Sequence, residues 1–557
     1  MFRTPDFRST TAGESYELSD PGTRLNELEQ DTTIDKSREE RIATRDAADL
    51  ARLGKRQVLK RNFTFLPILS FACTVIITWE ATFFTLELCL PNGGPAGAIY
   101  SFVLVWAGML CVFTTIGEMT SIAPTSGGQY YWVAMLAPKS YRKFLSYITG
   151  WITLIGWQAV TASTLYICAT LIQGLTVLAH STSSPTLWQG VLLVWAMVAF
   201  SVFFNTILGN LLPHVEALGM ILHVVGFFAI LVPMIYLSNH ADAKVIFTTF
   251  GNEGGWPTQG LAFMTILNGA VFDFLGSDSV IHMAEETRNA AKVSPKSMFI
   301  SITFNGVLGL AALIATTLCA DDLDAALNSP IGIPFIAIFL QTTQSVAGSM
   351  IMSVILLLMQ VFAAIGIMAA TSRMLWAFAR DRGVPGWRTL IKVDGKNHIP
   401  MNAIGVTVAI SCLLALLNLA GPIVFNDIVS LTVSSLLLSY FIVCALLLWR
   451  RCTRYMSYNT PVSQQIIIGD ENSVPELNWG PWHLRGAVGT FINFMSCAFL
   501  AVTVFFSFWP PEVNPTPQTM NMSVLMFGAT TLFAVIWYVI RGRMTYEGLI
   551  IELELDG

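Results

Sequence analysis

The chain has 557 residues, of which 54% are hydrophobic and only 12% are charged, about half the charged share of a typical soluble domain. Together with a mean hydropathy of +0.60, this composition excludes a soluble globular protein. The formal net charge of −5 says little about partners because the charges lie in tails and loops, and we expect no nucleic acid partner.

The first 62 residues are polar and rich in Ser, Thr, Asp, Glu and Arg, without the apolar core of a signal peptide. Their acidic residues also argue against a mitochondrial presequence. Such a composition buries too little apolar area to offset the entropy of ordering the chain. We therefore predict a disordered cytosolic tail over 1–62.

Apolar stretches of roughly 20 residues, long enough to cross a bilayer about 30 Å thick, recur along the rest of the chain. The sequence therefore predicts an all-α integral membrane protein with about twelve transmembrane helices. We place them near 64–90, 96–117, 144–178, 187–208, 214–237, 261–283, 298–320, 346–379, 402–420, 424–449, 485–508 and 519–541.

Basic residues indicate the orientation. With a cytosolic N-terminus, nearly all Lys and Arg near the span ends fall inside, whereas the outer loops contain only Lys244. This is the positive-inside rule across an even number of spans, so we expect both termini in the cytosol. We expect the plasma membrane, with a vacuolar or other internal membrane as the alternative.

An acidic residue interrupts the middle of the sixth predicted span, within Phe274–Asp278. A charge at this depth costs about 2.5–3.5 kcal/mol unless it faces a cavity or a pathway. Gly276 and Ser277 also allow the helix to break, which is tolerated only where the freed backbone lines such a cavity. A broken, acid-bearing span is typical of a transporter's substrate site, so we predict substrate contacts from Phe274, Gly276, Ser277 and Asp278.

Signatures of catalysis are missing from the sequence. It contains no Walker A, HExxH or GxSxG motif, and its seven His are scattered. The nine Cys form no ligand spacing and read as small apolar side chains. We therefore expect neither an enzyme nor a cofactor or metal site, and no transport driven by ATP within this chain.

Four groups of residues follow one another in a characteristic order: Gly93-Gly94-Pro95-Ala96-Gly97; Glu118 with Pro124–Tyr130; Gly276-Ser277-Asp278 with Glu285, Glu286 and Asn289; and Ser372–Trp376 with Phe378–Asp381 and Gly383–Pro385. In this order and spacing they resemble the amino acid–polyamine–organocation superfamily. Within it, the chain is most similar to the fungal amino acid/choline transporter family, which includes GABA and choline permeases. The resemblance runs from about residue 60 to the C-terminus.

The resemblance implies two inverted five-helix repeats with broken first and sixth helices that hold the substrate between them. The corresponding parts of the chain are the repeats 63–237 and 261–449, the outer loop 238–260, the cytosolic loop 450–484, two peripheral helices within 485–541 and a cytosolic tail, 542–557. It also implies secondary active transport of a small amine-bearing solute such as an amino acid, GABA or choline. The partners are then this solute, membrane lipid and a proton gradient in preference to sodium.

The expected break in the first span lies within Cys73–Glu80, where superfamily members usually have glycines and this chain has none. A missing glycine disfavours a backbone nest for a carboxylate and favours recognition through the substrate's amine. Thr78, Trp79 and Glu80 are our candidates, because a carboxylate beside aromatic faces suits an ammonium group. The alternative is that Glu80 pairs with another helix and only holds the bundle together.

His223 lies at the place in the fifth span where proton-coupled relatives often have a lysine. Because a histidine changes its charge near physiological pH, we predict that His223 carries the coupling proton. A neutral histidine bonded within the bundle is the alternative.

Further polar residues lie along the sixth span and at the inner span ends. We expect Asp278 to contact the substrate amine or a proton path, or else to support the helix break. Asp273 is expected in a hydrated vestibule, and His282 as a hydrogen-bonding residue of a cytosolic gate. The charged residues expected to close this inner gate by ion pairs are Glu118, Glu285, Glu286, Arg373 and Arg380.

Other classes of function stay open. A nutrient sensor with this fold would usually have longer signalling tails than the 1–62 and 542–557 segments. A channel would need a continuous polar stripe through several spans, whereas the polar residues here gather at two helix breaks. A transporter in a specialised-metabolite pathway also fits, and choline, GABA, other amino acids and polyamines all remain as substrates.

Overall fold

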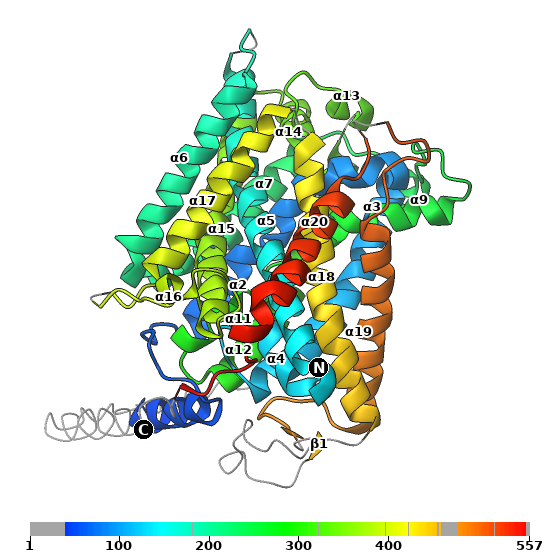
Figure 1. Ribbon diagram of the computed structural model, residues 1–557. Coiled ribbons are helices and arrows are strands. Elements are labelled where there is room, and N and C mark those ends of the chain that lie inside the picture. Colours follow the sequence, from blue (N-terminus) through cyan, green and yellow to red (C-terminus); the bar gives the residue numbers. More distant parts are fainter. Residues whose placement is uncertain are drawn as a thin grey trace, which may run out of the picture.

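The computed structural model describes residues 39–180, 182–320, 322–395, 397–420, 423–453, 456–457, 477–516 and 519–552, which form a bundle of long helices (Figure 1). The elements are α2 (Phe65–Ile76), α3 (Thr78–Ile122), α4 (Gln129–Leu136), α5 (Lys139–Ala179), α6 (Leu187–Thr206), η1 (Gly209–Leu211), α7 (Leu212–Leu237), α8 (Ala243–Thr248), α9 (Gln259–Thr265), α10 (Leu267–Phe272), α11 (Ser279–His282), η2 (Ala284–Glu286), α12 (Ala290–Cys319), α13 (Leu323–Leu327), α14 (Pro334–Thr343), α15 (Val346–Arg380), α16 (Trp387–Leu390), α17 (Met401–Leu416), η3 (Leu417–Ala420), α18 (Ile423–Cys452), β1 (Met456–Ser457), β2 (Leu477–Asn478), α19 (Gly486–Ser507), α20 (Ser523–Trp537), η5 (Tyr538–Gly542) and α21 (Arg543–Thr545). Strands β1 and β2 make one parallel pair.

Ten helical segments of the described chain are long and apolar enough to cross a membrane, which confirms a multi-pass membrane protein. Two predicted spans lie in one of these segments, Phe65–Ile122, because helix is assigned through the turn at Gly94. At Gly94 φ is 61°, and a Cβ would lie 2.7 Å from the backbone nitrogen of Gly251. Only glycine fits this close approach without strain. The sixth predicted span is absent from the ten because it is broken into α9, α10 and α11.

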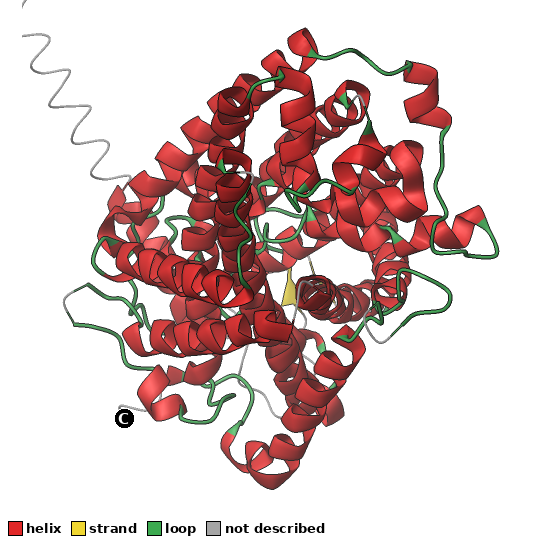
Figure 2. Cartoon of the chain, turned by 90° about the horizontal axis from the view of Figure 1, so that it is seen from above, coloured by secondary structure: helices red, strands yellow, loops and turns green. Residues whose placement is uncertain are grey.

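Corresponding helices of the two predicted repeats pack against one another. Helix α3 packs on α12, α5 on α15 and α6 on α17. Seen from above, the long helices lie side by side in one body, and many are viewed obliquely (Figure 2). Segments far apart in the sequence therefore share one apolar core, and the two helix breaks lie within it.

Both ends of the described chain lie at one end of the bundle, the lower end in Figure 1, which we call the tail end. The amide of Glu552 donates to the carbonyl of Gly54 at 2.8 Å. Helices α13 and α14 lie at the opposite end, which we call the far end.

The predicted disordered tail, 1–62, is corrected in part. Residues 1–38 lie outside the described residues, but 39–52 form a helix. The side chains of Leu50, Leu53 and Leu59 are buried. Composition alone missed this order because the few apolar residues pack on the membrane domain and need no core of their own.

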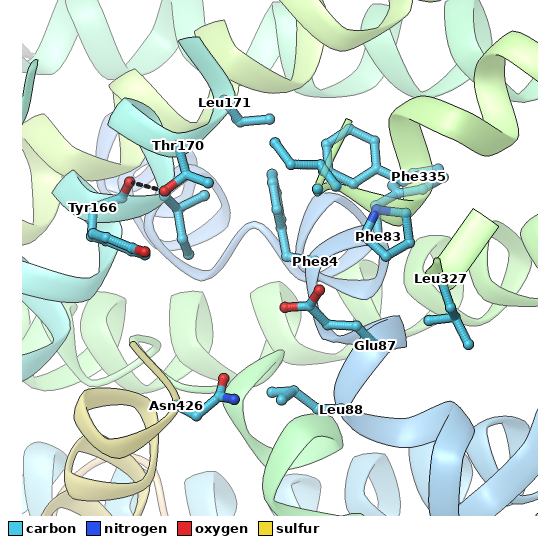
Figure 3. Close-up of a pocket in the computed structure, with 14 residues that line it drawn as sticks. Phe83, Phe84, Glu87, Leu88, Tyr166, Thr170, Leu171, Leu327, Phe335 and Asn426 are labelled. Carbon is cyan, nitrogen blue, oxygen red and sulfur yellow. Dashed lines mark hydrogen bonds between the residues drawn. The ribbon is translucent and has the colours of Figure 1, made fainter. Parts of the chain in front are cut away.

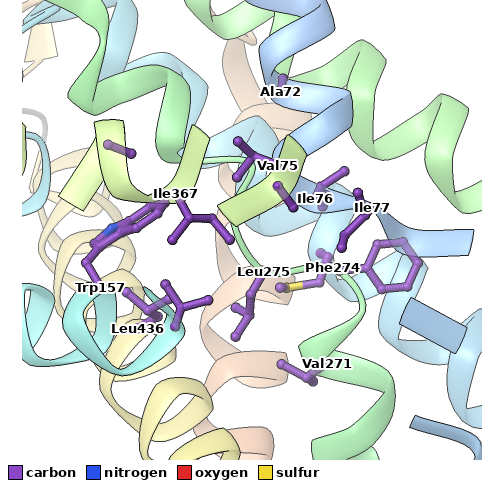
Figure 4. Packing of buried hydrophobic residues seen from close by; sticks show 14 of the residues in the cluster. Ala72, Val75, Ile76, Ile77, Trp157, Val271, Phe274, Leu275, Ile367 and Leu436 are labelled. Carbon is purple, nitrogen blue, oxygen red and sulfur yellow. The ribbon is translucent and has the colours of Figure 1, made fainter. Parts of the chain in front are cut away.

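Both expected helix breaks are present, and they contact each other (Figure 4). Helix α2 ends at Ile76, and Ile77 takes a left-handed conformation with φ 37° and ψ 46°, inside the predicted window. The break after α10 spans residues 273–278, where Gly276 has φ 103°. A Cβ on Gly276 would lie 3.1 Å from Cγ1 of Val75. The two breaks thus meet in a tight apolar contact, and the positive φ of Gly276 strains any L-residue at this position.

Replacing Gly276 with Ala should lower the free energy of unfolding by about 1–3 kcal/mol, because an L-residue is strained at this φ. The control is Gly405→Ala in α17, where a Cβ would meet nothing within 4 Å. Thermal unfolding of the purified protein in detergent measures both variants. Equal unfolding midpoints for the two would contradict the prediction.

Candidate functional site

Helix α7 presents His223 to the start of α3, directly after the first helix break. Nδ1 of His223 lies 2.7 Å from Oε1 of Glu80 and 3.2 Å from Nε1 of Trp79. All three side chains are buried. The structure therefore brings together two residues for which the sequence predicted separate roles, substrate binding and proton coupling.

A single ring nitrogen carries either one hydrogen or one lone pair in the ring plane. Nδ1 of His223 cannot both donate to Glu80 and accept from Trp79. The shorter contact fits donation to the Glu80 carboxylate. Within the described residues, Oε2 of Glu80 and Nε2 of His223 have no hydrogen-bond partner. The pair thus keeps one free acceptor on the carboxylate and one free position on the ring.

A second carboxylate of the site, Glu216 on α7, contacts the helix before the break. The hydroxyl of Thr74 donates to Oε2 of Glu216, whose side chain is fully buried. Glu216 and His223 are seven residues apart, so they lie on one face of α7. Sequence analysis did not select Glu216, although an acid seven residues before His223 in an apolar span was a usable signal.

Asp278, at the end of the sixth-span break, is buried and joined to the short helix α4. Its Oδ2 accepts a hydrogen bond of 2.9 Å from Nε2 of Gln129 and lies 3.9 Å from Nε2 of His282. Tyr440 and Trp157 lie close to the same carboxylate. The predicted motifs around Gln129 and Asp278 therefore form one polar cluster between the break and the tail end.

The other predicted residues of the breaks mostly contact protein. Ser277 Oγ lies 3.2 Å from Oγ of Ser301 on α12. The rings of Phe274 and Phe102 are 4.9 Å apart. The hydroxyl of Thr78 is buried without a hydrogen-bond partner among the described residues.

Asp273 was expected in a hydrated vestibule, and this expectation is wrong. Its side chain is buried, and its carboxylate accepts a hydrogen bond of 2.8 Å from Thr85. Helix α3 covers Asp273, which the sequence position alone did not reveal.

All five predicted inner-gate residues form ion pairs, and four of them pair with one another at the tail end. Arg373 pairs with Glu286 at 2.8 Å, and Arg380 pairs with Glu285 at 2.7 Å. Both pairs join the end of α15 to the segment after α11. Glu118 pairs with Arg451 of α18 instead and accepts from the amide of Leu484.

The last described residues extend this group of ion pairs. Arg380 also pairs with Glu552 at 2.7 Å, and Lys55 pairs with Asp381 at 2.6 Å. The amide of Ile550 donates to Asp381 as well, at 3.0 Å. The two tails and the predicted gate residues thus share one network of charges, which the sequence analysis did not anticipate.

Residues 63–530 match the amino acid permease family. The chain belongs to this family. The match confirms the predicted superfamily, and the fungal relatives agree with it. The chain is similar to the choline transporter of Saccharomyces cerevisiae, with 27% identity over 88% of this chain and 83% of the relative.

Other relatives are named amino-acid permeases. An uncharacterised amino-acid permease of Schizosaccharomyces pombe is 28% identical over 91% of this chain and 90% of its own length. Amino-acid permease 2 of Neurospora crassa is 25% identical over 90% of this chain and 88% of its own length. These names are those of transporters and not of enzymes.

Glu552 should hold its ion pair across the physiological pH range. Burial raises the pKa of Glu552, but the hydrogen bond from Arg380 and the charges of Arg380 and Lys55 outweigh burial and keep the pKa below its ordinary value of 4.5. A lowered pKa in the folded state stabilises the fold above the unfolded value, and this stabilisation is lost as pH falls through the folded value. The contact should therefore persist from neutral pH down to about pH 5.

Replacing Glu552 with Gln removes the charge that binds Arg380. The backbone amides of residues 550 and 552 should then exchange hydrogen about tenfold faster, because a hydrogen bond to a charged group is lost. The control is Glu547→Gln, since Glu547 is exposed. Hydrogen–deuterium exchange with mass spectrometry measures the segment. Equal exchange in wild type and Glu552→Gln would show that the charge does not hold it.

Proposed function

We propose that this permease moves a small amine-bearing solute, such as an amino acid, GABA or choline, and that a proton gradient drives it. Family membership supports the transport class. The names of the relatives, a choline transporter and amino-acid permeases, support the substrate class. The observation that carries proton coupling is the buried contact between Glu80 and His223.

One proton more or less on this pair changes the charge at membrane depth by one unit. A buried charge is costly, so protonation of the pair and the arrival of a cationic amine at Glu80 influence each other. Because both partners keep a free polar atom, the pair can accept an additional proton or a substrate group without first losing its internal contact. Glu80 and His223 thus act as one unit, in which Glu80 faces the amine and His223 carries the proton.

We further propose that Thr78, Trp79, Phe274, Gly276, Ser277 and Asp278 surround the substrate. Two observations support this proposal: the two breaks contact each other, and Asp278 lies in a polar cluster on the tail-end side of the breaks. Apolar side chains pack between the breaks here, which fits a closed state of the site (Figure 4). Opening then requires the breaks to separate.

The domain organisation supports such a movement. We propose that 63–237 and 261–449 are the two repeats, since α3, α5 and α6 each pack on their counterparts. We take the tail end as cytosolic because the basic loops lie there, and the plasma membrane as the location. The ion pairs of Glu285, Glu286, Arg373 and Arg380 then close the inner side.

Accumulation of a labelled amine in cells or vesicles should collapse when the proton gradient is dissipated and should persist without sodium. Uptake of choline, GABA and several amino acids with an ionophore, or after sodium replacement, measures this. Accumulation that needs sodium and survives the loss of the proton gradient would contradict proton coupling.

Replacing His223 with Gln should leave exchange of substrate intact but abolish its concentration. The amide can still donate to Glu80, yet it takes up no proton near neutral pH. The control is His240→Gln, because His240 is exposed in the outer loop. Net uptake and counterflow are compared at matched surface expression. Full concentrative uptake by His223→Gln would limit His223 to a structural role.

A further inference from the structure

A cavity of about 470 Å³ opens at the far end (Figure 3). It lies between the first part of α3, the second half of α5, the α13–α14 segment and the start of α18. Its walls are mainly apolar and aromatic, with Phe83, Phe84, Tyr166 and Phe335 among them. Glu87 is the one charged residue among the described residues that line it. No predicted site residue lies in this lining.

The Glu87 carboxylate points into this cavity (Figure 3). The side chain is half-buried, and burial is the main influence on it: no hydrogen bond or ion pair to a described residue is seen, although Tyr166 lies close enough to interact with it electrostatically. Because acids inside transmembrane segments are normally paired or face a pathway, an unpaired one in a cavity indicates a mobile partner.

The aromatic residues around Glu87 define the chemistry of this partner. The rings of Phe84 and Phe335 lie 5.1 Å apart edge to face, and those of Phe83 and Phe335 lie 6.0 Å apart. Aromatic faces attract a cation, and a quaternary ammonium, which has no hydrogen to donate, depends on such faces and on a counter-charge. No Lys or Arg of the described lining would receive a carboxylate on the ligand.

The floor of the cavity separates it from the deeper pair. The ring centroid of Phe83 lies 5.3 Å from that of Phe339 and 6.4 Å from that of Trp79. Phe83 therefore lies between the cavity and the Trp79–Glu80–His223 cluster. Glu80 and Glu87 are seven residues apart, about two turns or 10 Å along α3. Two acids thus follow one another along one helix, with an aromatic layer between them.

We propose that this cavity is a second binding site, a capture site for organic cations without a carboxylate, with Glu87 as the counter-charge and Phe83, Phe84 and Phe335 as the aromatic wall. A cation from the far side binds at Glu87 and moves to Glu80 when the aromatic layer opens. This inference rests on the proposed transport function, and it narrows the substrate class towards choline-like amines.

The probe is labelled tetraethylammonium, a quaternary cation, in binding to the purified full-length protein. Glu87→Gln should weaken its binding by about fivefold or more, which corresponds to one partly screened ion pair. Glu87→Asp should retain most of the affinity, because the charge is kept. The control is Glu253→Gln, an exposed acid on the same side, which should leave the affinity unchanged. A further variant, Glu80→Gln, tests whether the cation is held at the deeper pair instead.

Choline uptake measured in the same variants separates this proposal from the proposed function. Glu87→Gln should raise the half-saturating choline concentration while the maximal rate stays close to wild type. Tetraethylammonium binding that is equal in Glu87→Gln and Glu253→Gln, or lost only in Glu80→Gln, would overturn the capture site. If wild type transports no amine but binding still depends on Glu87, the transport function fails and the site stands.

Discussion

A carboxylate in the middle of a membrane-spanning helix must find its partner inside the protein, because hydrocarbon offers none. In this permease the contact between Glu80 and His223 meets that requirement directly after the first helix break. It joins α3 to α7 and places a titratable pair beside the contact of the two breaks. The proposed coupling, the position of the substrate and the path from the far end all depend on this pair.

Helix α7 contacts both halves of the broken first span through two polar residues on one face, Glu216 and His223. Thr74 before the break binds Glu216, and Glu80 after the break binds His223. Both halves of the broken helix are therefore fixed to the same neighbour. A movement of α7 would shift both halves, which would connect the proposed protonation of His223 to the proposed substrate site.

The ends of the bundle differ in how they are closed. At the tail end, Arg380 is shared by Glu285 and Glu552, so the gate and the C-terminal segment are bonded to the same side chain. At the far end, aromatic rings around Phe83 pack below Glu87, which no described residue pairs with as a counter-charge. Ion pairs require a change of partners to open, whereas packed rings require only a change of side-chain position. This difference agrees with the proposal that a cation enters from the far end.

What the sequence determined by itself is what depends on local composition. Apolar length predicted the spans, and the break positions were readable because glycine, serine and an acid stand out inside an apolar run, as at Gly276 and Asp278. The break at Ile77 fell in its window through the family resemblance, although no glycine marks it. The order of motifs also predicted the family.

Which residues pair was decided only by the tertiary structure. From the sequence, Glu80 could have contacted the substrate without a protein partner, Glu118 could have belonged to the inner gate, and Asp273 could have been exposed to water. The structure pairs them with His223, Arg451 and Thr85 instead. A partner depends on which helix faces meet, and helix tilt and rotation are set by packing along the whole bundle. For the same reason, sequence analysis did not predict the ion pair of Glu552 or the cavity at Glu87, since each is formed by segments that are far apart in the chain.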